Sequence, residues 1–91
     1  MKRYAVNPEV SLREEFEGAL LYNPDADDIV LINETGRIIW DAIAQPQTTA
    51  EIAAYLEANT EGAENVSADV DAFIESLLPN FVVIYDEAVP S

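Results

Sequence analysis

The first run of the chain alternates between apolar and polar side chains. Val10, Leu12 and Phe16 share one parity, and the positions of the other parity between them are polar. A period of two is typical of a half-buried strand, because successive side chains point to opposite faces of a sheet. Gly18 interrupts this run, so the pattern predicts a strand that begins near Val10 and ends before Gly18.

Two short apolar runs follow. Residues 19–22 and residues 29–32 are apolar, and the second run is rich in β-branched side chains, which favour strands. Residues 23–28 lie between them and are mostly Asn, Pro and Asp, residue types that form tight turns. Three strands joined by short turns predict an antiparallel meander.

The period becomes helical after residue 32. Asn33 can cap a helix that includes Ile39 and Ile43, which lie one turn apart on an apolar stripe. Thr48 and Glu51 have the spacing of a capping box, in which each residue bonds the backbone N–H of the other. They predict the start of a second helix.

A third helix and a last strand complete the pattern. Ser67 is predicted to cap this helix and Pro79 to end it. Its apolar residues follow the i, i+3, i+4, i+7 spacing and are Val70, Phe73, Ile74 and Leu77. Residues 81–85 are largely β-branched or aromatic and predict a fourth strand.

The predicted order of elements is β-β-β-α-α-α-β, which indicates one α+β domain. A three-stranded antiparallel meander followed by three helices and a short C-terminal strand suggests a winged-helix-like arrangement. We expect residues 1–9 to be an N-terminal extension, residues 10–85 to be the domain and residues 86–91 to be a C-terminal tail.

Composition narrows the range of functions. The 91 residues include 18 acidic and 4 basic side chains, giving a net charge of −14, and contain no His and no Cys. Cysteine nucleophiles, thiolate metal sites and histidine acid–base catalysis are therefore excluded, and a metal would have to be a hard cation bound by oxygen. The charge argues against binding to nucleic acid or to an anionic membrane. No signal peptide or membrane-spanning run is visible, which favours the cytoplasm.

Three features could carry chemistry, and each has a simpler structural interpretation. Asp25, Asp27 and Asp28 could form a calcium loop, but they lack the central Gly and the bidentate Glu of an EF-hand, which favours a solvated hairpin turn. Trp40 could line a ligand pocket, although a lone Trp on an apolar helical stripe is more often part of the core. Gly36 fits no phosphate-loop pattern and is interpreted as a close-packing glycine between strand and helix.

A winged-helix order also raises the possibility of DNA binding. The third helix carries Asp69, Asp71 and Glu75 but no Lys or Arg. Contacts with DNA phosphates need cations, so the charge argues against this function.

The remaining candidate is a surface for another polypeptide. A meander has two edges, and an exposed edge strand can accept a partner segment through main-chain hydrogen bonds. Alternatively, residues 81–85 cover that edge. Both arrangements are compatible with the sequence.

Four segments carry a family resemblance, namely LLYNP at 20–24, IVLINETGRIIW at 29–40, TTAEI at 48–52 and DVDAFIESL at 69–77. Together they resemble the PqqD-like family, which supplies the RiPP recognition elements of peptide-modification pathways. The resemblance covers about residues 10–85, and its most specific part is the apolar strand followed by Asn-x-Thr-Gly and an Ile-Trp helix. The last strand, at residues 81–85, is longer and more apolar than the family pattern.

The resemblance implies a peptide-binding domain without catalysis. In family members, the leader segment of a ribosomally made precursor peptide binds as an additional strand beside the third strand of the sheet. It also packs against the third helix. On this chain the strand residues would be Asp28, Ile29, Val30, Leu31 and Ile32. The helix residues would be some of Val70, Phe73, Ile74 and Leu77, which are also candidates for the core.

We therefore expect a non-enzymatic peptide chaperone that presents the leader-bound precursor to a modifying enzyme, expected to be a radical SAM protein. No catalytic residue, cofactor or metal site is expected. The acidity indicates a basic partner surface, either on the leader or on the enzyme. The alternative hypothesis is an acidic interaction module that docks a basic partner surface without strand addition, and a carboxylate-only enzyme is a third.

Overall fold

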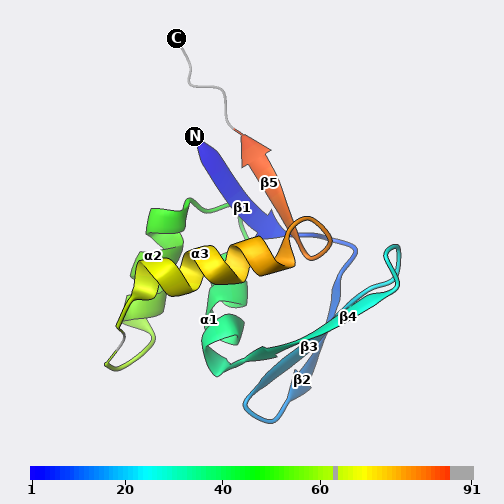
Figure 1. Cartoon of the computed structure of the whole chain (residues 1–91), viewed down its shortest axis with the longest axis horizontal. Helices are drawn as coiled ribbons and strands as arrows, with labels where there is room; N and C mark the ends of the chain where they lie inside the picture. The colour runs from blue at the N-terminus through cyan, green and yellow to red at the C-terminus, as the bar shows by residue number, and fades with distance from the viewer. Residues whose placement is uncertain (63, 87–91) are drawn as a thin grey trace.

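The computed structural model describes residues 1–62 and 64–86, which form two antiparallel sheets and three helices (Figure 1). In chain order the elements are β1 (Lys2–Val6), β2 (Ser11–Glu15), β3 (Gly18–Asn23), β4 (Asp28–Asn33), α1 (Glu34–Ala42), α2 (Thr49–Ala58), α3 (Val66–Leu77) and β5 (Val82–Asp86). The predicted α+β class is confirmed, with the meander, the three helices and the C-terminal strand in the predicted order.

The predicted N-terminal extension contains a strand, β1, that the pattern did not predict. β1 pairs antiparallel with β5, with Tyr4 opposite Ile84, and the two strands form a separate ribbon. Tyr4 and Gln47 also exchange backbone hydrogen bonds of 2.7 and 3.0 Å. The alternation in β1 is weak because Ala5 is its one buried residue. The predicted tail begins on the last residue of β5, and residues 87–91 lie outside the described residues.

The turn between β2 and β3 differs from the prediction. The pairing of β2 with β3 ends where Glu15 faces Gly18, so Gly18 is the first residue of β3 and does not separate the strands. Glu17 takes a φ of 60° in the turn, and Phe16 beside it is 92% exposed. Phe16 therefore leaves the strand before its side chain can reach the core, and its predicted place on the buried parity is wrong.

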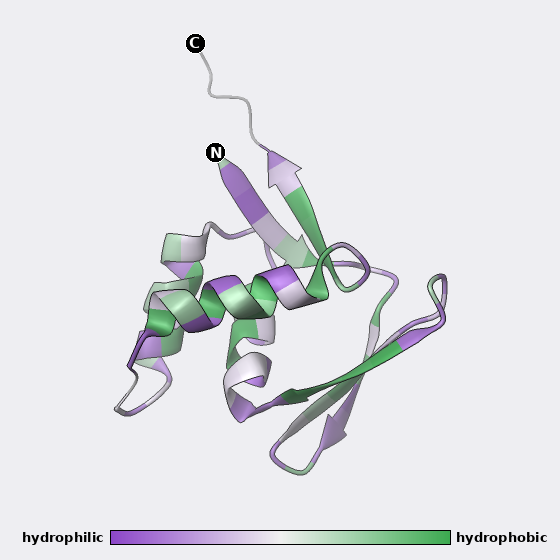
Figure 2. Cartoon of the chain, in the orientation of Figure 1, coloured by the Kyte–Doolittle hydropathy of each residue, from purple (hydrophilic) through white to green (hydrophobic). Residues whose placement is uncertain are grey.

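The core lies between one face of the β2–β4 sheet and the three helices. Ala19 and Leu21 of β3 and Ile32 of β4 are buried on this inner face. The buried helix and cap residues that meet them are Ile39, Trp40, Ile43, Ile52, Leu56, Val66, Val70, Ile74 and Leu77. Hydrophobic and hydrophilic positions alternate along α3, as expected for a helix with one buried face (Figure 2). The interpretation of Trp40 as a core residue is confirmed.

Helix starts show which predicted caps form. Oδ1 of Asn33 accepts a 2.8 Å hydrogen bond from the backbone N–H of Gly36, which confirms the cap of α1. The predicted cap at Ser67 is wrong, because the N-cap of α3 is Asn65, two residues earlier, in the left-handed region at a φ of 54°. Starting the helix at Val66 places that side chain in the core, where it is buried.

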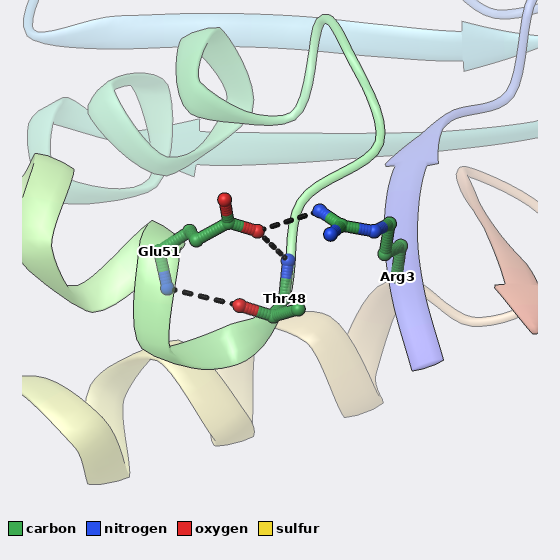
Figure 3. Close-up of polar contacts among 3 residues, drawn as sticks. All are labelled: Arg3, Thr48 and Glu51. Atoms are coloured by element: carbon green, nitrogen blue, oxygen red, sulfur yellow. Dashed lines mark hydrogen bonds and ion pairs between the residues drawn. The ribbon is translucent and has the colours of Figure 1, made fainter. Parts of the chain in front are cut away.

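The capping box of α2 is confirmed and gains a further partner (Figure 3). The backbone N–H of Thr48 donates to Oε1 of Glu51 at 2.9 Å, and the N–H of Glu51 donates to the Thr48 hydroxyl at 3.2 Å. The guanidinium of Arg3, on β1, donates to the same carboxylate oxygen at 2.7 Å. One carboxylate thus joins the start of α2 to the N-terminal strand.

Glu51→Gln should change how stability depends on pH. Hydrogen bonds from the Thr48 backbone and hydroxyl, followed by the charge of Arg3, hold the pKa of Glu51 below its usual 4.5. A carboxylate whose pKa is depressed by folding stabilises the fold above its unfolded pKa and loses that effect as the pH falls through the folded value. The excess in melting temperature of the wild type over Glu51→Gln should therefore be largest above pH 4.5 and shrink below it.

Thermal melts between about pH 7 and pH 3 would measure this difference. Gln keeps the hydrogen-bond acceptor of the capping box, so the comparison isolates the charge. Glu57→Gln, which changes an exposed carboxylate on the same helix, is the matched control. If the difference in melting temperature between the wild type and Glu51→Gln stays constant with pH, folding does not lower the pKa of Glu51.

Candidate peptide-binding site

β4 lies at the edge of the three-stranded sheet, whose order is β2-β3-β4. β5, which contains most of the run that could have covered this edge, pairs with β1 instead. Within residues 1–62 and 64–86 no strand pairs with the other side of β4. The backbone N–H and C=O groups that point away from β3 are therefore available to a partner strand.

The side chains of β4 alternate between the two faces of the sheet. Val30 is half-buried and Ile32 is buried on the inner face, whereas Ile29 and Leu31 are 59% and 71% exposed on the opposite face. Asp28 is exposed at the start of the strand, next to the hairpin turn. The five predicted strand residues thus share one edge, but Val30 and Ile32 alone among them face the helices.

The predicted residues of α3 divide into two groups. Val70 and Ile74 are buried in the core. Phe73 is half-buried, and together with Leu77 it lines a groove between α3 and β4. The structure therefore brings Phe73 and Leu77 to the edge strand, although Leu77 is also buried in the core, and assigns Val70 and Ile74 to packing alone.

The groove has a volume of about 200 Å³. Its lining residues are Val30, Leu31, Ile32, Asn33, Phe73, Ser76 and Leu77. Sequence reasoning missed Asn33 and Ser76. The sequence pattern predicts only a helix cap at Asn33, and Ser76 is exposed on α3, where the apolar spacing gives no signal for it. The Ser76 hydroxyl donates to the carbonyl of Phe73 at 2.8 Å, within the groove wall.

Gly36 lets the aromatic ring of Phe73 approach the first turn of α1. A Cβ at position 36 would lie 2.7 Å from Cε2 of Phe73 and 3.1 Å from Cβ of Ile32. These distances are too short for ordinary packing, so the interpretation of Gly36 as a close-packing glycine is confirmed. The position of the Phe73 ring in the groove depends on the missing side chain of Gly36.

Asn23 fixes the hairpin between β3 and β4 to the rest of the fold. Its side chain is buried, its Oδ1 accepts from the backbone N–H groups of Asp25 and Ala26, and its Nδ2 donates to the carbonyl of Asn80 at 2.5 Å. Asn7 donates to the same carbonyl at 3.0 Å. This network holds the start of β4 against the segment before β5.

The three aspartates of this hairpin do not form a metal site in the structure. Residues 24–27 form the turn, as predicted, and Asp25, Asp27 and Asp28 are exposed. In the described part of the chain no group of three or more carboxylates is arranged to hold a metal ion.

A second, larger hollow is acidic. It has a volume of about 570 Å³ and lies where the β2–β3 turn, the start of α1 and the loop after α2 meet. The carboxylates that line it are Glu14, Glu15, Glu17, Glu34 and Glu61. Arg37, also in its wall, donates to Glu14 at 2.7 Å and to Asp41 at 2.5 Å. This hollow can attract cations but has no apolar strand edge, unlike the groove beside β4.

No described helix is long and apolar enough to cross a membrane.

Comparison with known proteins agrees with this geometry. Residues 18–80 match the family described as coenzyme PQQ synthesis protein D (PqqD). The chain belongs to the PqqD family. The matched residues contain the β3–β4 hairpin, all three described helices and hence both walls of the groove. No curated protein matches the chain significantly.

A solved structure has the same fold. It is titled lasso peptide synthetase B1 complexed with the leader peptide, and it matches with a TM-score of 0.70 and 20% sequence identity. The match covers 88% of this chain and 96% of that chain. At this identity the comparison establishes the fold of the PqqD-family chain.

Proposed function

We propose that this PqqD-family protein binds the leader segment of a ribosomally made precursor peptide at β4. The observation that carries the proposal is an open strand edge beside an apolar groove in a domain of this family. The structural relative whose title includes a leader peptide supports the choice of ligand.

The leader would add to β4 as a further strand. Its backbone would bond the outward-facing groups of residues 28–32, and alternate side chains would enter the groove between β4 and α3. Phe73, which is half-buried, supplies apolar surface there, so the groove favours an apolar leader side chain.

The protein would act without catalysis and present the leader-bound precursor to a modifying enzyme. A radical SAM protein is the enzyme class we propose. The winged-helix-like outline and the cytoplasmic location stay predictions from the sequence.

Amide hydrogen exchange with and without a synthetic leader of the cognate precursor peptide tests strand addition. Alternate amides of an edge strand point to its free side, so leader addition should slow exchange at every second amide between residues 28 and 33. Amides of β2, at the opposite edge, provide the internal control. If the leader binds and β4 exchange is unchanged, strand addition is ruled out.

The alternative function, docking of a basic partner surface without strand addition, is favoured by the acidic hollow. Binding of this kind should weaken strongly as salt increases, because exposed charges are screened. Docking of this kind should also occur without any slowing of hydrogen exchange at the β4 amides. The exchange experiment repeated at low and high salt therefore separates the two functions.

A further inference from the structure

The outer face of the β2–β4 sheet carries an exposed apolar stripe that meets the leader groove only at Leu31. Leu31 of β4 lies opposite Leu20 of β3, and Ile29 lies opposite Tyr22. These four residues, called the outer stripe here, have the strand parity opposite to that of the buried Leu21 and Ile32. Leu31 and Ile29 are among the most exposed large apolar side chains described. Apolar side chains gathered on one face mark an interaction surface more often than single exposed ones do.

A leader added at the edge would leave most of this stripe uncovered. An added strand lies beside β4 at a spacing of about 4.8 Å, in the plane of the sheet, so it cannot cover the outer face of β3. Leu20 and Tyr22 are one strand further from the edge than β4. The stripe therefore needs a partner that lies across the sheet.

Charge indicates the chemistry of that partner. Residues 11–33 contain six carboxylates and one cation, Arg13, whose guanidinium donates to Glu15 at 2.6 and 2.9 Å. Acidic residues stand in both hairpin turns, Glu17 at one end of the sheet and Asp25 and Asp27 at the other. A second copy of this chain would bring like charges together, since each copy carries −14. An apolar surface with a basic rim is complementary.

We propose that the outer stripe is the docking surface for the modifying enzyme, through an apolar patch surrounded by Lys and Arg. The inference rests on the proposed function, because a leader-binding protein must meet the enzyme that acts on the precursor. Docking here would place the enzyme beside the leader on β4 without competing for the groove.

The test measures two affinities for each variant, one for the synthetic leader and one for the purified modifying enzyme that acts on the same precursor. Leu20→Thr should weaken enzyme binding about tenfold, since loss of a central apolar contact commonly costs that much, and leave leader affinity unchanged. Ile29→Thr, at a 59% exposed position outside the groove lining, should weaken enzyme binding similarly and leave leader affinity unchanged. Ile84→Thr is the matched control, because Ile84 is an exposed apolar residue on a strand of the other sheet.

Enzyme affinity that is unchanged in both Leu20→Thr and Ile29→Thr would overturn the proposal. So would an equal loss of enzyme affinity with Ile84→Thr. A dimer of the wild-type chain in sedimentation that Ile29→Thr dissociates would overturn it as well. The failure of leader binding in every variant would instead overturn the proposed function, while the enzyme measurements would still report on the outer stripe.

Discussion

Gly18→Ala is expected to lower the free energy of unfolding by about 3 kcal/mol, the upper part of the range for overpacking in a tight interior. A Cβ at position 18 would lie 1.9 Å from the carbonyl oxygen of Ile32 and 3.0 Å from its carbonyl carbon. Both atoms belong to backbone in the partner strand, so they cannot move aside as a flexible side chain would. The β3–β4 pair must separate at this end, which also disturbs the strand that carries the proposed site.

Equilibrium unfolding in urea, followed by circular dichroism, would measure this loss. Gly62→Asn is the matched control. Among the described residues beyond its chain neighbours no atom lies within 4 Å of a Cβ built at Gly62, and its φ of +66° is one that Asn tolerates. The control should be close to the wild type in stability. An equally small effect of Gly18→Ala would mean that β3 and β4 are not paired in this register.

Gly18 also illustrates a limit of pattern reading. The sequence pattern indicates a break after a strand at this residue, because glycine is usually found between elements. The alternative use of glycine, where two backbones approach closely, depends on the partner strand and leaves no periodic signal. The same limit hid β1, whose pairing with β5 joins residues about eighty positions apart.

Helix caps were predicted more reliably than strands, where all the residues of the cap lie within one helical turn. The Asn33 cap and the Thr48–Glu51 box form as predicted, since both depend on residues within one helical turn. Ser67 is a good capping residue by type, but Val66 before it is apolar and buried. Burial of Val66 moved the start of α3 to a residue whose side chain forms no cap bond.

The candidate site was predicted in part. The strand edge followed from the apolar run and from the family resemblance, and the structure leaves that edge open within the described residues. Which residues of α3 face it could not follow from spacing. Val70 and Phe73 belong to the same apolar stripe, yet the first is in the core and the second lines the groove. The division is set by where β4 and Gly36 lie against the helix, which is a tertiary property.

The strongest expected effect on binding is that of Phe73→Ala, which should weaken leader affinity about thirtyfold, as truncation of a central aromatic contact does. The Phe73 ring lies against Gly36 and forms part of the groove wall next to Val30 and Ile32. Because the ring is half-buried, stability should fall less than for a fully buried Phe. Titration of a fluorescently labelled synthetic leader would give the affinity.

Tyr55→Ala, at an exposed aromatic residue of α2 outside the groove lining, is the matched control and should bind the leader as the wild type does. Gly36→Ala provides a second route to the same site without removing the ring. Its methyl group would lie 2.7 Å from Cε2 of Phe73, so the ring must shift and the groove must change shape. Weaker leader binding in both Phe73→Ala and Gly36→Ala, in variants that remain folded, would locate the leader in this groove. Normal leader binding in both variants would mean that no leader side chain enters this groove, even if the leader backbone pairs with β4.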